Sequence, residues 1–266
     1  MNDRFKYNLL LDESLDLRGF HKAQEIDDKV FKTDKLFIST LAMDFEADVT
    51  LGYRKKLEKK WIEIFPKLDN VKFLSLRHRV DQDFFNSVCQ MKNLEFLQFW
   101  TSTVENITAI KSLTNLRKLH IDSFSRLTDL SPIKDLKHLE WLVVQNCFKI
   151  INYDIIGDLV NLKALAIHGD KIAPRNLRLK SLKPFEGLTN LQHLDINTTI
   201  VQDMSYDSVL RMKNLKRFDI STKIRKDLRE KIELHPNLKA GFFLDWDWEN
   251  NKLFEGKNWD INVHNM

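Results

Sequence analysis

The sequence predicts an α/β solenoid of eight repeats with a cap at each end. Its curved parallel β-sheet would form the concave face, with short helical or extended segments on the convex face. Two observations predict this fold. LTNLRKLHI at residues 113–121 returns almost unchanged as LTNLQHLDI at residues 188–196. Related nine-residue segments recur through most of the chain at a nearly constant interval, which is the signature of a repeat architecture.

The eight copies align on one anchor residue, which is asparagine in seven of them. The anchors are Asn70, Asn93, Asn115, His138, Asn161, Asn190, Asn214 and Asn237. Their successive intervals are 23, 22, 23, 23, 29, 24 and 23 residues. A unit of that size holds one short strand, a turn and a brief return. Because it cannot bury its apolar side alone, it must stack on its neighbours.

Residues 1–64 lack the complete repeat and are expected to cap the start of the array, whose first unit would otherwise expose its core. DKLFISTL at 34–41 is typical of a strand, and YRKKLEKKWIEIF at 53–65 is typical of an amphipathic helix. The apolar stripe of this helix consists of Leu57, Trp61 and Ile64. Its basic residues predict either a solvated face or a docking site for acidic groups.

Residues 65–243 hold the array, and every copy has the same apolar positions. These positions stand one, four and six residues after the anchor, as in Leu116, Leu119 and Ile121 of the third copy. The last two have the period-two spacing of a strand with one buried face. Positions three, five and seven should therefore point outward and form rows across a parallel sheet. An asparagine anchor tolerates left-handed backbone and bonds nearby backbone, which suits the turn before each strand.

This L-x-x-L-x-L core and its period resemble leucine-rich repeat proteins, of the short-repeat type found in internalins and in cytosolic phosphatase-regulator arrays. The resemblance covers residues 65–243 and implies a non-enzymatic protein that binds a partner through its concave sheet. The chain departs from the family nine positions after the anchor, where asparagine or cysteine is expected and only Cys147 conforms. We therefore expect the family's ladder of buried asparagines to be largely missing.

The single 29-residue interval contains an insertion, HGDKIAPRNLRLKSLKPFEGL, at 168–188. Inserted loops in repeat arrays often carry recognition, so a basic contact surface is one interpretation and an ordinary solvated loop is the other. The candidate loop contacts are Lys171, Arg175, Arg178 and Lys180.

Residues 244–266 are expected to close the array as a cap, formed by a hairpin around Gly256. If the alternation of the last strand continues, Phe243 points inward while Phe242 and Trp246 point outward. NWDINVH at 258–264 alternates as well and would cover these outward aromatics. The alternative is an exposed aromatic surface that binds another chain.

The sequence predicts no catalytic site, no cofactor and no metal site. It contains no G-x-G-x-x-G, G-x-x-x-x-G-K-[ST], H-E-x-x-H, G-x-S-x-G or C-x-x-C motif. His120, His168 and His193 are expected on the outer strand face, in different rows and too far apart for one metal. We therefore expect scattered surface histidines, and we expect Cys147 to be a buried structural thiol.

Composition suggests a cytoplasmic monomer that does not contact a membrane. Cys89 and Cys147 are the only cysteines and provide no disulfide framework, which suits a reducing compartment. The apolar run YNLLL at 7–11 is too short for a signal peptide or a spanning helix. The formal net charge is +4, which is too small to predict nucleic-acid binding.

Aromatic and basic side chains gather in the N-terminal half of the predicted concave face. The predicted partner-binding residues are Phe73, Arg77, Phe96, Trp100, Lys118, His120 and Trp141. Large aromatics with arginine are enriched at the energetic centres of protein interfaces. Alternatively, the aromatic pairs only stabilise the sheet.

We therefore expect a non-enzymatic interaction module that binds a protein partner, in a scaffold, inhibitor or immunity-type role. The alternative is nucleic-acid or polyanion binding through the basic loop 171–183 and the basic segment 211–231. Asp122, Asp195 and Asp219 on the concave face count against binding along a phosphate backbone. Nucleic acid is therefore the less favoured partner.

Overall fold

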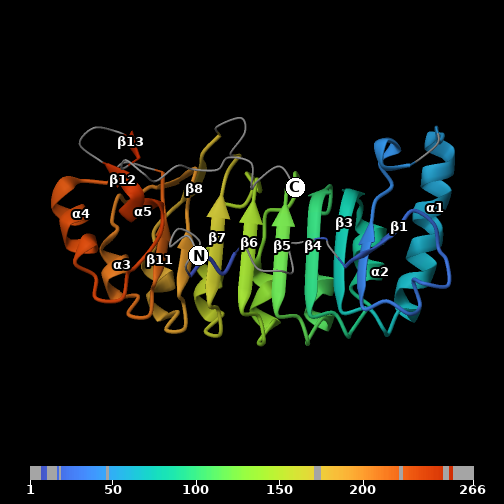
Figure 1. Cartoon of the computed structure of the whole chain (residues 1–266), viewed down its shortest axis with the longest axis horizontal. Coiled ribbons are helices and arrows are strands. Elements are labelled where there is room, and N and C mark those ends of the chain that lie inside the picture. Colours follow the sequence, from blue (N-terminus) through green and yellow to red (C-terminus); the bar gives the residue numbers. More distant parts are fainter. Residues whose placement is uncertain are drawn as a thin grey trace.

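The computed structural model describes residues 7–10, 17, 19–45, 48–170, 175–221, 224–247 and 252–253. Its main feature is a nine-stranded sheet in the order β1-β2-β3-β4-β5-β6-β7-β9-β11, with every neighbouring pair parallel. Figure 1 shows these strands side by side along the molecule. Spatial order follows chain order, as stacked coils require. The predicted leucine-rich repeat solenoid with a parallel sheet is confirmed.

The repeat strands begin three residues after their anchors. The nine strands of the sheet are β1 (His21–Ala23), β2 (Lys35–Ile38), β3 (Phe73–Val80), β4 (Phe96–Ser102), β5 (Lys118–Asp122), β6 (Trp141–Gln145), β7 (Ala164–His168), β9 (His193–Asp195) and β11 (Arg217–Asp219). Phe73 pairs with Phe96, Phe96 with Lys118, and Lys118 with Trp141. The row continues to an isolated bridge between Arg217 and Ala240. This register agrees with the alignment on the anchors.

Between successive strands, short helices and 3-10 turns carry the chain from the end of one strand back to the start of the next. The α-helices are α1 (Leu51–Ile64), α2 (Gln82–Val88), α3 (Asp207–Arg211), α4 (Lys226–Glu233) and α5 (Phe242–Asp245). The 3-10 turns are η3 (Ala42–Asp44), η4 (Phe65–Lys67), η5 (Thr108–Ser112), η6 (Ser131–Asp135), η7 (Asp154–Asp158) and η8 (Lys183–Gly187). A coil of about 23 residues leaves room for no longer helix after its strand and turns.

The core lies between the sheet and these returns. Leu116 and Leu119 are fully buried, and Ile121 is 1% exposed. One continuous apolar cluster runs from Ala23 to Phe243 through every coil. The predicted inward positions are therefore confirmed.

The anchor asparagines join successive coils. Asn93 Nδ2 donates to the Asp69 carbonyl oxygen at 2.9 Å, which belongs to the residue before the preceding anchor. The same bond, at 2.6–3.0 Å, joins Asn115 to Lys92, Asn161 to Lys137, Asn190 to Val160, Asn214 to Thr189 and Asn237 to Lys213. The expected bond to nearby backbone is thus replaced by one across coils. Left-handed backbone occurs instead eight positions after the anchor, at Ser123, Asn146 and Thr198.

Position nine after the anchor holds no asparagine, as expected, and several coils have a small donor there instead. Thr199 Oγ1 donates to the Ile167 carbonyl at 2.7 Å, and Ser102 Oγ donates to the Val80 carbonyl at 2.9 Å. Cys147 Sγ lies 3.1 Å from the Gln145 carbonyl. A hydroxyl or thiol can supply the donor that an asparagine amide would supply, whereas Phe124 fills the position with buried apolar surface.

The N-terminal cap contains the two expected elements and one further strand. β2 lies within the predicted strand, and α1 begins at Leu51, two residues before the predicted start. Thr50 Oγ1 accepts from the Tyr53 amide at 3.1 Å and so caps the helix. Leu57 and Trp61 are buried as expected. The short strand β1 was not predicted.

The C-terminal cap differs from the expectation after Phe243, which is buried as predicted. The strand ends because Gly241 has a φ of 116°, and Phe242–Asp245 form helix α5 instead of continuing the alternation. The hairpin pairs β12 (Trp246–Asp247) with β13 (Lys252–Leu253), so the chain reverses before Gly256. Gly256 and 258–264 lie outside the described residues.

The insertion adds a separate two-stranded parallel sheet of β8 (Leu177–Leu179) and β10 (Thr199–Val201). Leu177 and Leu179 are buried, while Arg178 between them is exposed. In the described part of the chain, we find no helix with the length and apolar character that crossing a membrane requires.

Candidate functional site

The candidate site lies on the sheet face that carries positions three, five and seven after each anchor, which we call the concave face. Phe73, Arg77, Trp100, Lys118 and His120 are partly exposed there, and we call these five residues the aromatic–basic patch. Phe96 is fully buried and Trp141 is 3% exposed. The expectation that these two aromatics face solvent is therefore wrong.

The N-terminal residues of the chain cover these two aromatics. Leu10 and Phe20 are 8% and 7% exposed, and they share an apolar cluster with Phe96, Trp141 and Val143. This cluster is separate from the main core, on the other face of the sheet. Figure 1 shows a short dark-blue piece of the chain start beside β6 and β7.

Two polar contacts fix where this N-terminal segment lies. Trp141 Nε1 donates to the Leu9 carbonyl oxygen at 3.0 Å. The Lys216 ammonium, just before β11, lies 5.4 Å from the centre of the Tyr7 ring. Tyr7 therefore lies near β11 and Leu9 lies at β6, whereas Phe20 directly precedes β1. The run YNLLL, which has no place in the repeat pattern, was the sequence signal for this contact.

Hydrogen bonds hold the aromatic–basic patch across three strands. Ser75 Oγ donates to Gln98 Oε1 at 2.8 Å, and Gln98 Nε2 lies 3.0 Å from His120 Nδ1. Trp100 Nε1 donates to Ser75 Oγ at 3.3 Å. The Arg77 guanidinium carbon lies 5.7 Å from the centre of the Trp100 ring. The structure thus brings the predicted Arg77, Trp100 and His120 together in one network.

Phe73 and Lys118 complete the patch on the row that starts each strand. The Lys35 ammonium lies 5.3 Å from the centre of the Phe73 ring, and that ring packs 6.4 Å from the Phe96 ring between centroids. Lys118 stands between Phe96 and Trp141 in the register. The patch therefore borders the aromatics that the N-terminal segment covers.

A buried charge cluster occupies the other end of the concave face. Arg217 Nε and His193 Nε2 lie 2.6 and 2.8 Å from Asp219 Oδ2, and all three side chains are at most 5% exposed. Burial alone would raise the pKa of Asp219, but the hydrogen bond and charge of His193 and the charge of Arg217 outweigh it and hold that pKa below its ordinary value. His168 is also buried, so the expectation of surface histidines is wrong for His168 and His193.

Asp122 has the opposite electrostatic environment. Burial raises the pKa of its carboxyl group to about 6, with a further contribution from the charge of Asp170. Hydrogen bonds from Ser123 Oγ at 2.7 Å and Asn146 Nδ2 at 3.1 Å act in the other direction. The folded protein therefore keeps a proton on Asp122 up to a higher pH than the unfolded chain does.

Replacing Asp122 with asparagine is expected to stabilise the protein at pH 7 by about 1–3 kcal/mol. Because the folded pKa is above the unfolded value of about 3.9, the native state binds more protons between these values, so wild-type stability falls as pH rises from about 4 to about 6. Asparagine does not titrate, and its amide oxygen can accept both hydrogen bonds. Urea unfolding of wild type and variant at several pH values would measure the difference.

Asp129→Asn is the matched control for this prediction. Hydrogen bonds from the Ser131 hydroxyl and amide hold the pKa of Asp129 below its ordinary value, so this substitution should destabilise the protein above pH 4. A stability difference between wild type and Asp122→Asn that does not change between pH 4 and pH 7 would contradict the prediction.

The structure describes three of the four candidate loop contacts. Arg178 on β8 and Lys180 just after it are exposed. Arg175 is exposed as well, and its guanidinium carbon lies 3.9 Å from the centre of the Phe148 ring. Lys171 lies outside the described residues.

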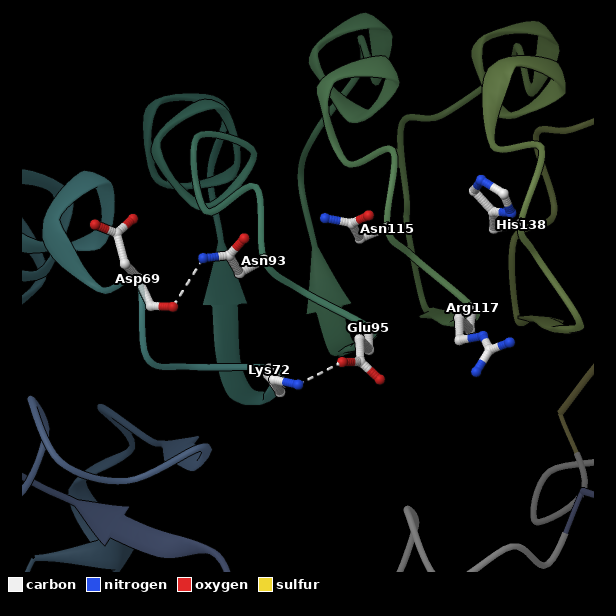
Figure 2. A pocket seen from close by; sticks show the side chains of 7 residues that line it. All are labelled: Asp69, Lys72, Asn93, Glu95, Asn115, Arg117 and His138. Atoms are coloured by element: carbon white, nitrogen blue, oxygen red, sulfur yellow. Dashed lines mark hydrogen bonds and ion pairs between the residues drawn. The ribbon is translucent and has the colours of Figure 1, made fainter.

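A shallow polar groove of about 460 Å³ runs along the edge where the strands begin. Its lining residues are Asp69, Lys72, Asn93, Glu95, Asn115, Arg117 and His138. Figure 2 shows the ion pair between Lys72 and Glu95, whose charged atoms are 2.9 Å apart. Arg117 pairs with Glu140 at 2.9 Å. These two ion pairs each join neighbouring coils and neutralise the charges of Lys72, Glu95 and Arg117.

The cysteines are not poised for chemistry. Cys89 and Cys147 are free and buried. Burial raises the pKa of the Cys147 thiol to about 12 and shifts that of Cys89 in the same direction, so neither is a thiolate at neutral pH. Among the described residues, no group of three or more histidine, cysteine and acidic side chains could hold a metal ion.

Comparisons with known proteins connect this architecture to solved structures. No protein-family model matches the sequence, and no curated protein matches it either. Its structure is similar to an internalin (inlF) from Listeria monocytogenes, with a TM-score of 0.58 and 18% identity, over 82% of this chain and 58% of the internalin. It is also similar to internalin C2 from the same organism, with a TM-score of 0.53 and 19% identity, over 66% of this chain and 73% of that chain.

These likenesses concern the fold. The chain spans 58% of the length of the first internalin, and sequence identity to both structures is below 20%. The fold likeness agrees with the repeat pattern of the sequence. What the chain binds must therefore be argued from its own surface.

Proposed function

We propose that this chain, which has the leucine-rich repeat fold seen in the internalins, is a non-enzymatic module that binds a protein partner through its concave face. The fold supports this proposal because stacked repeats produce a long, rigid sheet face whose outward positions are free to vary. Scaffold, inhibitor and immunity-type roles all use such a surface.

The aromatic–basic patch is the observation that carries the proposal. Its five side chains remain partly exposed where the neighbouring Phe96 and Trp141 are covered. Trp100 and Arg77 are held against each other, and Trp100 is also held by Ser75. Aromatic and arginine side chains that are ordered before binding lose little conformational entropy on association, which favours their use as contact centres.

The covered aromatics have a different role in this proposal from the one that the sequence predicted. Phe96 and Trp141 form the floor beside the patch and contact the chain's own N-terminal segment. They are therefore not contacts for a partner while Leu10 and Phe20 are in place.

Polyanion binding through the basic segment 211–231 is the less favoured function. Arg211 pairs with Glu186 at 2.6 Å, Arg225 pairs with Asp227 at 3.0 Å, and Arg217 is buried against Asp219. Cations that are already paired with carboxylates gain less from a phosphate. Steeply salt-dependent retention on heparin resin would instead favour this alternative.

A cytoplasmic location and a monomeric state belong to the same proposal. Two free, buried thiols require no oxidising compartment. Sedimentation of the purified chain at micromolar concentration would test the monomer.

The double variant Arg77→Ala/Trp100→Ala is expected to lose the partner while remaining folded. Removing an aromatic and an arginine from the centre of an interface typically costs more than 2 kcal/mol, which weakens affinity at least about 30-fold. The wild-type chain would be immobilised, partners captured from a lysate of the source organism, and the captured protein then titrated against each variant by calorimetry.

Ile151→Ala/Val160→Ala is the matched control, because both side chains are exposed apolar groups away from the strands, at 71% and 54% exposure. The control should bind as wild type does. Equal affinity of the captured protein for wild type, control and the patch variant would remove the aromatic–basic patch from consideration.

A further inference from the structure

We propose that the covered part of the concave face is a groove for an extended apolar peptide segment of the protein partner, and that the chain's own N-terminal segment competes for this groove through Leu10 and Phe20. This inference rests on the proposed function and specifies the chemistry of its partner. The groove consists of Phe37, Phe96, Trp141, Val143, Ala164 and Ala166.

Among the described residues, none before β1 belongs to the main apolar core. The main apolar cluster of the described residues begins at Ala23 and lies on the helix side of the sheet. The cluster that contains Leu10 and Phe20 lies on the concave side, and the groove residues are its other members. Removing the segment would therefore expose one face of an otherwise complete solenoid.

The N-terminal segment contacts the sheet through inserted side chains, as a bound peptide ligand would. Hydrogen bonds from Leu9 N to Tyr7 O and from Phe20 N to Leu17 O stay within the segment, at 3.0 and 3.1 Å. Leu10 and Phe20 are inserted, whereas Leu9 and Leu17 are only partly buried against the cluster. The described residues of the segment reach the sheet through apolar side chains and the Trp141–Leu9 hydrogen bond, outside the strand ladder, so we expect a local stability below that of the core strands.

The floor of the groove defines the chemistry of a replacing segment. Ala164 and Ala166 on β7 are small and pair with the larger Trp141 and Val143 on β6, so the floor is lower over β7 and can accept branched apolar side chains. Trp141 Nε1 offers one donor, which requires a backbone carbonyl or another acceptor. These features fit an extended segment with leucine-like side chains.

The dimensions of the floor set the length of that segment. Phe37 on β2 and Ala164 on β7 are separated by five strand spacings, which is about 24 Å at about 4.8 Å per spacing. An extended chain covers about 3.3–3.6 Å per residue, so about seven residues span the groove. A short linear segment of a partner is therefore sufficient.

The test uses full-length protein and a fluorescein-labelled synthetic peptide with the sequence of residues 7–20, YNLLLDESLDLRGF. In the wild type, the chain's own segment is present at a millimolar effective concentration and should exclude the peptide. Leu10→Asp should release that segment, because a carboxylate cannot be buried in the groove without a partner. Fluorescence anisotropy should then show at least tenfold tighter peptide binding to Leu10→Asp than to wild type.

Two controls define the groove as the binding place. A peptide in which both leucines equivalent to Leu9 and Leu10 are replaced by aspartate should bind neither protein. Adding Trp141→Phe to Leu10→Asp keeps the ring on the floor but removes the donor, and it should weaken peptide binding several-fold. Leu9→Asp is the second releasing variant and should behave as Leu10→Asp does.

Equal peptide affinity for wild type and the two releasing variants would overturn the competition, and absence of binding to folded releasing variants would overturn the groove. Loss of cooperative unfolding in both variants would show that residues 7–20 belong to the folded core, and would overturn the proposal as well. The peptide test does not involve Arg77 or Trp100. Its failure is therefore distinguishable from failure of partner binding at the aromatic–basic patch.

Discussion

Asp219→Ala is expected to lower the free energy of unfolding by about 3–5 kcal/mol, because it leaves buried charge without a partner. Asp219 Oδ2 and Oδ1 lie 2.6 and 3.0 Å from Arg217 Nε and Nη2, and the guanidinium is 4% exposed. Asp219 Oδ1 also accepts from the Phe242 amide at 2.7 Å, which ties α5 to the sheet. Urea unfolding at pH 7, followed by circular dichroism, would measure the loss.

The pair Arg225 and Asp227 is a matched control, since it has the same spacing in sequence but side chains that are 72% and 60% exposed. Asp227→Ala should change stability by less than about 0.5 kcal/mol. The double variant Arg217→Met/Asp219→Leu replaces both buried partners. It should lower the free energy of unfolding by less than Asp219→Ala alone does. A double variant that is less stable than Asp219→Ala would show that the unpaired guanidinium is not the cause.

The pH dependence of the same group has a defined sign. Since the folded pKa of Asp219 is held below its ordinary value, its contribution to stability is complete above the unfolded pKa of about 3.9. The contribution is lost as pH falls through the lower folded pKa. The difference between wild type and Asp219→Ala should therefore shrink in acid.

Phe99→Ala is expected to lower the free energy of unfolding by about 3–5 kcal/mol, through lost burial and the cavity that remains. Phe99 is fully buried on the core side of β4, and its ring centroid lies 5.5 Å from Phe85 and 5.4 Å from Phe124. These rings come from three successive coils, so the cavity would open between coils. Thermal and urea unfolding would both report the change.

Trp100→Ala is the control, because Trp100 follows Phe99 in β4 and faces the concave side, where it is partly exposed. Replacing Trp100 with alanine should lower the free energy of unfolding by about 1 kcal/mol. If Phe99→Ala and Trp100→Ala lowered the free energy of unfolding equally, the two faces of the sheet would be assigned incorrectly.

Most of the fold could be predicted because a solenoid repeats its contacts. A residue at a given position after one anchor touches the residue at the same position after the next, so spacing along the chain specifies neighbours in space. Phe73, Phe96, Lys118 and Trp141 form one row for this reason. The inward positions followed from the same regularity.

The candidate site could be predicted only in part. The rows and the grouping of Arg77, Trp100 and His120 were predicted correctly, and these residues are partly exposed. Exposure itself depends on the whole chain. His193 and Arg217 occupy outward positions in the repeat pattern, yet both are buried against Asp219.

The period, the parallel register and the two faces of the sheet follow from the amino-acid pattern, because each of these depends on contacts between equivalent positions of adjacent coils. That Phe96 and Trp141 are covered becomes visible in the folded chain alone. That contact joins Trp141 to Leu9, 132 residues earlier in the chain, and Leu9 belongs to a segment outside the repeat. No periodicity encodes such a contact, because its energy depends on two surfaces that meet only after the array has folded.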